Sequence, residues 1–277
     1  MKNAKNKEKQ PVLVLGGTGK TGHRVVQRLK GQQWPVRVGS RANTPPFDWL
    51  DQTTWQPALD GIKAVYVTFQ PDLAVPGADE AIRSFTDVAV SSGVEQVVLL
   101  SGRGEKAAQD CEQIIRAAGV EWTILRASWF NQNFSESYLL DPIRDGFVAL
   151  PAGQIAEPFV DADDIAEVAV AALTEEGHAG QVYELTGPRL LTFGEAIAEI
   201  ARATGRSLPY EPVPVDAYAA ALREASVPDE YVQLLTYLFT DVLDGRNAHL
   251  TDGIERALGR KPVDFSDYVQ KTVVTGI

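Results

Sequence analysis

The chain is 277 residues long, 44% of its residues are hydrophobic, and its formal net charge at pH 7 is −11. This size and composition suffice for a full hydrophobic core, arranged as one large domain or as two unequal ones. The acidic charge argues against nucleic acid as a partner, because phosphate contacts need a basic face, and no stretch is apolar enough for a membrane span.

Residues 1–10 are polar and rich in lysine, and we expect them to form a disordered tail. They lack the apolar core of a signal peptide. Cys111 is the only cysteine, which excludes an internal disulfide and is typical of a reducing cytosol. The sequence therefore predicts a soluble, cytoplasmic protein with a buried thiol in a helix.

The most informative segment follows this tail. Residues 12–15 are four apolar residues in a row, which is typical of a buried strand. Three glycines then follow at regular spacing, Gly16, Gly19 and Gly22. A glycine turn between a strand and a helix lets main-chain amides approach a pyrophosphate, next to the positive end of the helix dipole. The other candidate phosphate contacts in the loop are Thr18, Lys20 and Thr21.

The same segment is not the phosphate loop of an ATPase. That motif would need a glycine where Val14 stands. A serine hydrolase is also unsupported, because the chain contains no G-x-S-x-G elbow.

Strands and helices are expected to alternate over the first half of the chain. The predicted strands are 12–15, 36–39, 64–68, 96–101 and 122–126, with 53–55 as the candidate for a further strand. The predicted helices between them are 21–31, 79–93 and 105–118. This alternation implies right-handed crossovers and an α/β fold with a doubly wound parallel sheet of the Rossmann type.

The pattern changes after the last of these strands. Short strands are predicted at 146–151 and 182–185. Three aspartates open a helix, namely Asp161, Asp163 and Asp164. Acidic side chains at a helix start favour the helix dipole, so we interpret them as capping groups and not as a metal site. The three histidines are scattered and have no metal-ligand spacing.

The last part of the chain is mainly helical. Thr192 and Glu195 form a capping-box pattern for a helix over 193–204. We expect a smaller, mainly helical C-terminal cap that binds the substrate. The predicted division is a tail at 1–10, an NADP-binding Rossmann domain at 11–150, and last core elements interleaved with the cap at 151–277.

The end of the second strand distinguishes the two nicotinamide cofactors. A carboxylate there bonds the ribose of NAD, whereas a basic or hydroxyl side chain accommodates the extra phosphate of NADP. Here Ser40 and Arg41 end the strand, and Arg41 can make a bidentate phosphate contact. The sequence therefore predicts NADP(H). The ends of later strands supply further candidate cofactor contacts at Thr68, Phe69, Gln70, Ser101 and Gly102.

Several motifs are typical of one protein family. They are G-G-T-G-K-T-G at 16–22, V-L-L-S at 98–101, W-T-I-L-R-A-S-W-F at 122–130 and F-V-D-A-D-D-I-A at 159–166. On these motifs the chain resembles the NmrA-like branch of atypical short-chain dehydrogenase/reductases over most of its length. The block at 129–134 looks most like that of bacterial relatives of the ergot-alkaloid iminium reductases.

The Tyr-x-x-x-Lys pair that typical short-chain reductases use as a proton donor is missing. No tyrosine has a lysine four residues later, and Gly104 and Ala108 stand where the pair would be. Ser101 keeps the place of a catalytic serine or threonine, and Lys106 is the remaining candidate proton donor. Without the pair, reduction of an ordinary ketone loses general-acid help of about 10²- to 10⁴-fold. Iminium ions, quinones and other conjugated acceptors need less protonation and are favoured.

The resemblance implies that the aromatic block lies near the nicotinamide and the substrate. Its candidate substrate contacts are Trp129, Phe130, Asn131 and Asn133. Flat rings can stack on a conjugated acceptor or a cation, and an amide can orient a polar group. Alternatively, Trp129 and Phe130 are core residues that join sheet and cap, because aromatic side chains are mostly buried.

These features predict an NADPH-dependent oxidoreductase that transfers hydride to a planar, electron-poor small molecule. The alternative is an NADP(H)-sensing regulatory protein of NmrA type without turnover. A third reading is an isomerase or dehydratase that uses bound nicotinamide transiently. The expected partner is a small-molecule substrate, without nucleic acid, membrane or metal, and the helical tail is compatible with a homodimer.

Overall fold

The computed structural model describes residues 8–275, and side chains as far as Thr272. The chain forms two compact units. Unit 1 consists of Met1–Ala127, Ala162–Leu185 and Asp252–Arg260, and unit 2 of Ser128–Asp161, Thr186–Thr251 and Lys261–Ile277. The chain therefore leaves unit 1 well before the predicted boundary at residue 150 and returns to it twice. Most of the predicted tail lies outside the described residues.

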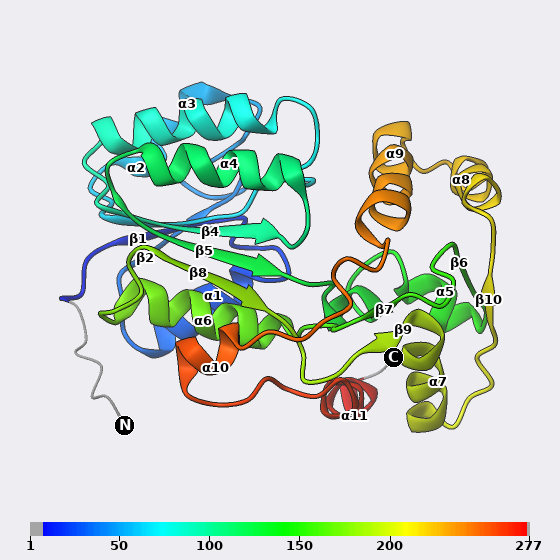
Figure 1. Cartoon of the computed structure of the whole chain (residues 1–277). Helices are drawn as coiled ribbons and strands as arrows, with labels where there is room; N and C mark the ends of the chain where they lie inside the picture. The colour runs from blue at the N-terminus through cyan, green and yellow to red at the C-terminus, as the bar shows by residue number, and fades with distance from the viewer. Residues whose placement is uncertain (1–7, 276–277) are drawn as a thin grey trace. The chain divides into compact units, whose positions relative to one another are not determined.

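Unit 1 is built on a six-stranded parallel sheet (Figure 1). Its strands are β1 (Val12–Leu15), β2 (Val36–Gly39), β3 (Ala64–Val67), β4 (Gln96–Gly102), β5 (Glu121–Ala127) and β8 (Gln181–Leu185). Their order across the sheet is β2-β1-β3-β4-β5-β8. The order reverses between β1 and β3, and ligands of such sheets bind outside the carboxyl ends of the strands at this switch point. The predicted doubly wound α/β fold is confirmed.

Helices cover both faces of this sheet. They are α1 (Gly22–Gly31), α2 (Trp55–Leu59), α3 (Ala78–Ser91), α4 (Lys106–Ala117), α6 (Ala162–Thr174) and α10 (Gly253–Leu258). In Figure 1, α2, α3 and α4 lie on one face, and α1, α6 and α10 on the other. The crossovers through α2, α3 and α4 therefore lie on one face, and those through α1 and α6 lie on the other, as in a doubly wound sheet.

The strand predicted at 53–55 is wrong. Residues Gln52–Thr54 form a short 3₁₀ helix, and α2 begins at Trp55. The Asp51 side chain accepts a hydrogen bond from the amide of Thr53 at 3.0 Å and so caps this turn. The Trp55 ring is buried in the core, and a single helical turn is enough to bury it.

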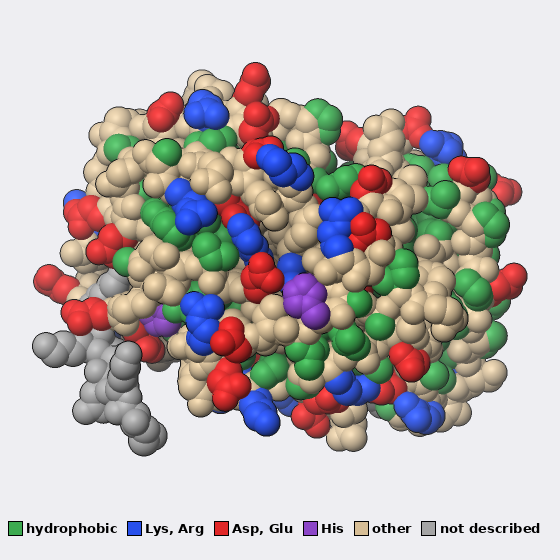
Figure 2. Space-filling view, viewed as in Figure 1, with side chains coloured by type: hydrophobic (Ala, Val, Ile, Leu, Met, Phe, Trp, Pro, Cys, Tyr) green, Lys and Arg blue, Asp and Glu red, His purple; other side chains and the backbone are tan. Residues whose placement is uncertain are grey.

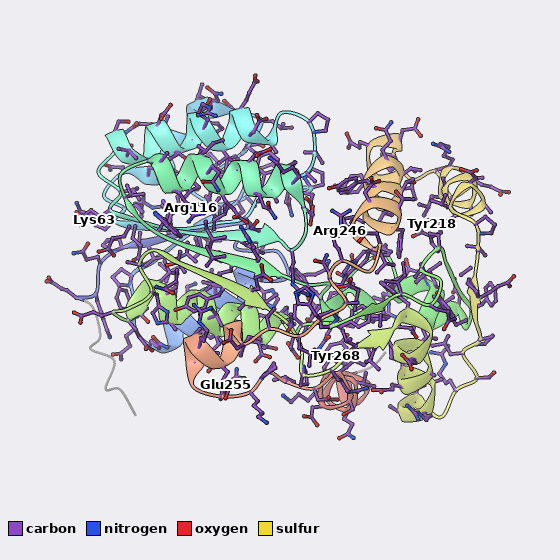
Figure 3. The ribbon with its side chains drawn as sticks, viewed as in Figure 1. Lys63, Arg116, Tyr218, Arg246, Glu255 and Tyr268 are labelled. Carbon is purple, nitrogen blue, oxygen red and sulfur yellow. The ribbon has the colours of Figure 1, made fainter. Side chains whose placement is uncertain are left out.

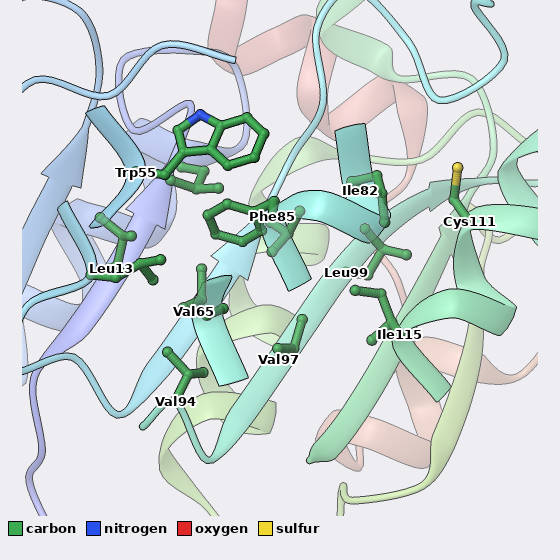
Figure 4. Packing of buried hydrophobic residues seen from close by; sticks show 14 of the residues in the cluster. Leu13, Trp55, Val65, Ile82, Phe85, Val94, Val97, Leu99, Cys111 and Ile115 are labelled. Atoms are coloured by element: carbon green, nitrogen blue, oxygen red, sulfur yellow. The ribbon is translucent and has the colours of Figure 1, made fainter. Parts of the chain in front are cut away.

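One hydrophobic core of unit 1 lies between the sheet and the layer of α2, α3 and α4, and residues of α1 and α6 are buried on the other face. Figure 4 shows it as side chains from strands facing side chains from helices, including Leu13, Val65, Val97, Leu99, Ile82, Phe85 and Ile115. Cys111 is fully buried at its margin, as predicted. Burial is the main cause that raises the pKa of its thiol to about 11, so the thiol stays protonated at neutral pH.

Unit 2 combines short strands with helices. Its elements are η2 (Asn131–Phe134), α5 (Leu140–Asp145), β6 (Val148–Leu150), β7 (Ala156–Glu157), β9 (Leu191–Thr192), α7 (Phe193–Thr204), β10 (Tyr210–Pro212), α8 (Val215–Glu224), α9 (Asp229–Tyr237), the π-helical turn η3 (Leu238–Val242) and α11 (Phe265–Thr275). Strand β6 pairs with β10 and β7 with β9. The predicted capping box of α7 is confirmed, because Glu195 N donates to Thr192 Oγ1 at 3.1 Å and Thr192 N donates to Glu195 Oε2 at 2.8 Å.

Aromatic rings form the core of unit 2. Phe193 is fully buried, and its ring centroid lies 5.0 Å from that of Phe159 and 5.6 Å from that of Phe239. Tyr218 of α8 and Tyr268 of α11, both labelled in Figure 3, complete this cluster of buried rings. The offset and edge-to-face contacts are the favoured geometries for aromatic pairs.

Figure 2 shows Lys and Arg side chains interspersed with Asp and Glu side chains over the face in view. Among the residues that the structure describes, no helix meets the length and hydropathy that a membrane span requires.

Candidate functional site

The predicted phosphate loop is a tight glycine turn between β1 and α1. Gly16 has a φ of +59°, and the amide of Gly19 donates to the carbonyl of Gly16 at 2.8 Å. A Cβ atom on Gly22 would lie 2.1 Å from the Gly16 oxygen. The close approach of α1 to the loop therefore requires glycine at residue 22.

This turn has the donors that a pyrophosphate needs. Within the described chain, the amides of Gly17 and Thr18 donate to no main-chain acceptor. The first turn of α1 contains no acidic residue, so its dipole favours an anion. Thr18 is exposed and Lys20 is half-buried. The loop therefore fits the pyrophosphate of a nicotinamide dinucleotide.

Thr21 differs from its predicted role. Its side chain is buried, and its Oγ1 accepts a hydrogen bond from Tyr66 Oη at 3.1 Å. This contact joins the start of α1 to β3. In the described structure, the hydroxyl of Thr21 thus stabilises the loop from inside.

Ser40 and Arg41 lie directly after β2, beside the loop in the sheet order. Ser40 is half-buried and its hydroxyl donates to Asn43 Oδ1. Arg41 is exposed and forms no ion pair within the described residues. Its guanidinium is available to a phosphate group, and the predicted role of Arg41 stays a prediction.

The residues after β3 are closely packed. Thr68 Oγ1 donates to the carbonyl of Leu15 at 3.1 Å, and the Thr68 carbonyl accepts from Trp49 Nε1 at 3.1 Å. The ring of Phe69 lies 4.9 Å from that of Trp49. Gln70 is exposed. The backbone near Thr68 is thus fixed against β1, and Trp49 is a residue of this edge that the sequence analysis missed.

Ser101 belongs to a buried polar network. Its hydroxyl donates to Glu112 Oε1 at 2.7 Å, and Arg126 holds both oxygens of Glu112 at 2.8 and 2.6 Å. Arg126 and Arg103 also contact Glu184. The network ties β4, β5, β8 and α4 together at the carboxyl edge of the sheet, so Ser101 has a structural partner.

Lys106 points away from this network. Its side chain is 78% exposed and pairs with Asp110 on the surface of α4. Gly102 lies opposite the carboxyl group of Glu105, which is hydrogen-bonded to Asp72. These two carboxyls could not be predicted from the sequence, because no local pattern relates a residue after β3 to one after β4.

In unit 2, the predicted substrate contacts differ in burial and in their contacts. Trp129 packs against Phe193 and Phe239 with centroid distances of 5.2 and 5.1 Å, so it is a core residue of that unit. Asn131 is fully buried, and neither atom of its amide group has a hydrogen-bond partner in the described structure. Phe130 and Asn133 are half-buried. The amide of Asn131 is therefore the polar group in this block that is left for a ligand.

The three aspartates near α6 form separate contacts. Asp163 pairs with Arg28, Asp164 with Arg260, and Asp161 accepts from Gln132 Nε2 at 2.9 Å. Asp163 and Asp164 also lie in the first turn of α6, as expected, where acidic side chains favour the helix dipole, and the capping role stays a prediction. Among described residues, no cluster of His, Cys, Asp and Glu has the arrangement of a metal site.

Comparison with known proteins agrees with this geometry. A family described as NAD(P)H-binding matches residues 16–176, and the NmrA-like family matches residues 105–270. Agroclavine dehydrogenase of Claviceps fusiformis is 31% identical over 93% of this chain and 96% of its own length. An NAD(P)H azoreductase of Xenophilus azovorans is 28% identical over 94% of this chain and 96% of its own.

Solved structures show the same fold. The quinone oxidoreductase QOR2 of Escherichia coli, in complex with NADPH, aligns with a TM-score of 0.79 at 21% identity, over 95% of this chain and 99% of that one. The chain therefore belongs to the NmrA-like family of NAD(P)H-binding oxidoreductases. The predicted family, fold and class of NAD(P)H-dependent reductase are confirmed at this level.

Proposed function

We propose that this protein is an NADPH-dependent reductase that transfers hydride to a planar, electron-poor small molecule such as an iminium ion, a quinone or another conjugated acceptor. The observation that carries this proposal is the glycine cradle before α1 together with the exposed Arg41 after β2. The reduced nicotinamide supplies the hydride, and the chain binds and orients it. The relatives support the acceptor class, since their names include an agroclavine dehydrogenase, an azoreductase and a quinone oxidoreductase.

The proposal places the main-chain amides of residues 17 and 18 on the pyrophosphate and the guanidinium of Arg41 on the extra phosphate of NADPH. A lost hydrogen bond to a charged group costs about 1.5–3 kcal/mol, or about ten- to a hundredfold in affinity. We therefore expect Arg41→Ala to weaken NADPH binding by that factor and to leave NADH binding unchanged.

Calorimetry with both cofactors measures this difference. Arg83→Ala is the matched control, because Arg83 is an exposed arginine of unit 1 on α3. Equal affinity of the Arg41 variant and the wild type for NADPH would contradict the cofactor assignment. Turnover is tested by the loss of NADPH absorbance with a panel of quinones, iminium salts and enones, and no reaction with any of them would contradict the reductase.

The second candidate is an NADP(H) sensor without turnover. It is favoured by Gly104 and the buried Ala108, which stand where a catalytic Tyr–Lys pair would be. The buried amide of Asn131 favours the reductase, because an unpaired polar group within an apolar unit provides a specific contact for a ligand. Tight NADPH binding without oxidation by any acceptor would favour the sensor.

A further inference from the structure

Two carboxyl groups meet at the carboxyl edge of the sheet in unit 1. Asp72 lies in the loop after β3, and Glu105 lies between β4 and α4. Strands β3 and β4 are neighbours, so these loops emerge side by side. The two side chains are hydrogen-bonded to each other. Carboxylates only accept hydrogen bonds, so this contact requires that the pair hold a proton.

The Glu105 side chain lies in a space that exists because Gly102 has no side chain. The residue is 5% exposed, and its Oε2 is buried without a hydrogen-bond partner among the described residues. A Cβ atom on Gly102 would lie 1.8 Å from Glu105 Oε1, so only glycine at that position leaves room for the carboxyl group. Asp72 is half-buried and accepts from the amide of Ala74 at 2.8 Å. Asp72 is therefore the member of the pair that reaches the surface.

The electrostatic surroundings keep this proton in place at neutral pH. Burial, and then the charge of Asp72, raise the pKa of Glu105 to about 9, and burial also raises the pKa of Asp72. From α4, the neighbouring thiol of Cys111 has its own pKa raised by burial and by acidic groups that include Asp72. The cation nearest along the chain, Lys106, pairs with Asp110 at the surface.

We propose that the Asp72–Glu105 pair is the proton donor of this enzyme. The inference rests on the proposed reductase function. Both loops lie at the edge of the sheet where ligands of doubly wound sheets bind. A carboxylic acid kept neutral by its surroundings can donate a hydrogen bond or a proton, as ketosteroid isomerase illustrates.

A proton donor at this position distinguishes two classes of hydride acceptor, because only one of them needs a proton. A quinone that takes a hydride from reduced nicotinamide becomes an oxyanion. The O–H bond of the carboxyl pair then breaks, and a new O–H bond forms at that oxygen. The pair is left with one more negative charge and regains a proton from water through Asp72. An iminium cation becomes a neutral amine when it takes a hydride and needs no proton.

Glu105→Gln tests this assignment, with Glu80→Gln on the exposed start of α3 as the matched control. We expect the kcat for menadione to fall by about 10²- to 10⁴-fold and the kcat for an N-methyl dihydroisoquinolinium salt to stay unchanged. Asp72→Asn removes the charge that raises the pKa of Glu105. Glu105 should then lose its proton at a lower pH. As pH increases, the activity of this variant with menadione should therefore decline at a lower pH than that of the wild type. An equal loss with both acceptors would overturn the assignment.

The stability of the protein without cofactor provides a second measurement. A carboxyl whose pKa rises from 4.5 to about 9 on folding makes the folded state less stable as pH increases through this window. Glu105→Gln should remove this decrease, whereas Glu80→Gln should keep it. An unchanged pH dependence of unfolding in Glu105→Gln would overturn the assignment.

A wild type that reduces neither acceptor contradicts the proposed function itself, whereas normal menadione reduction by Glu105→Gln contradicts only the proton donor.

Discussion

The two units differ in whether their buried polar side chains have hydrogen-bond partners. In the described part of unit 1, Glu105 Oε2 is the only buried side-chain oxygen or nitrogen without a hydrogen-bond partner, and the Glu112 network shows how completely the others are paired. Unit 2 leaves the amide of Asn131 and the hydroxyls of Tyr138 and Tyr210 unpaired among its aromatic rings. An unpaired buried group costs free energy unless a ligand or water completes it.

This difference distinguishes a unit that pairs nearly all its buried polar groups from one that leaves several of them for a ligand or water. The parallel sheet of unit 1 is fixed by main-chain pairing and by charged hydrogen bonds at its carboxyl edge. The core of unit 2 consists largely of aromatic rings that contact one another.

Removing the central ring of unit 2 should have the largest effect on stability. Phe193 is fully buried and contacts four other aromatic rings. Phe193→Ala should cost about 3–5 kcal/mol of unfolding free energy, measured by urea denaturation. If the loop of unit 1 forms its cofactor contacts independently, NADPH affinity below the transition should not change. A fall in NADPH affinity along with stability would contradict the contrast between the units.

Filling the glycine cradle should, in contrast, abolish cofactor binding. In Gly22→Ala, the new Cβ would lie 2.1 Å from the Gly16 oxygen and 2.9 Å from the Gly17 Cα. We expect a stability loss of about 1–3 kcal/mol from overpacking and the loss of measurable NADPH binding in calorimetry. Gly31→Ala at the other end of α1 is the control, since its Cβ meets no atom within 4 Å. Normal NADPH binding by Gly22→Ala would show that the loop is not the phosphate site.

Ser101→Ala distinguishes a structural serine from a catalytic one. The change removes the hydrogen bond to Glu112 and leaves the two contacts of Glu112 with Arg126. We expect a loss of about 1.5 kcal/mol in unfolding free energy and little change in kcat for the iminium salt. A large fall in kcat with normal stability would return Ser101 to the catalytic role that the sequence suggested.

The smallest effect concerns an ion pair of unit 2. Hydrogen bonds from Arg189 hold the pKa of Asp264 well below its usual value, so the pair stabilises the folded state above pH ~4 and this contribution is lost as pH falls. Both side chains are about one-third exposed, which limits the contribution to about 0.5–1 kcal/mol. Asp264→Asn should lose this amount at pH ~7 and less at pH ~3, in contrast to the exposed control Asp267→Asn. An equal loss at both pH values would contradict the pairing.

The sequence predicted unit 1 well because its signals are local. The strands at 12–15 and 36–39 have the predicted bounds, and residues 12–15 are an apolar run that is buried on both faces of the parallel sheet. The start of α7 was also predictable from neighbouring residues, because Thr192 and Glu195 form its capping box. The strand predicted at 53–55 was wrong because Asp51 caps a helical turn at these residues.

The candidate site was only partly predictable. The spacing of the glycines in the sequence is itself the signal for the loop, so the glycine turn could be predicted. The partners of Ser101 and Thr21 come from other elements, Glu112 and Tyr66, and no nearby residue indicates them. The contact of Asp72 with Glu105 depends on which strands are neighbours, and that order exists only after folding.

The interrupted course of the chain has a consequence for biosynthesis. Strand β8 covers the outer edge of β5, yet its residues are synthesised after the whole of Ser128–Asp161. A nascent chain that ends near residue 127 therefore presents β5 as a bare edge, a surface on which other chains can add strands and aggregate. A polypeptide truncated at that point would expose the same edge permanently, so a self-sufficient nucleotide-binding module cannot be cut from the N-terminal half of this sequence.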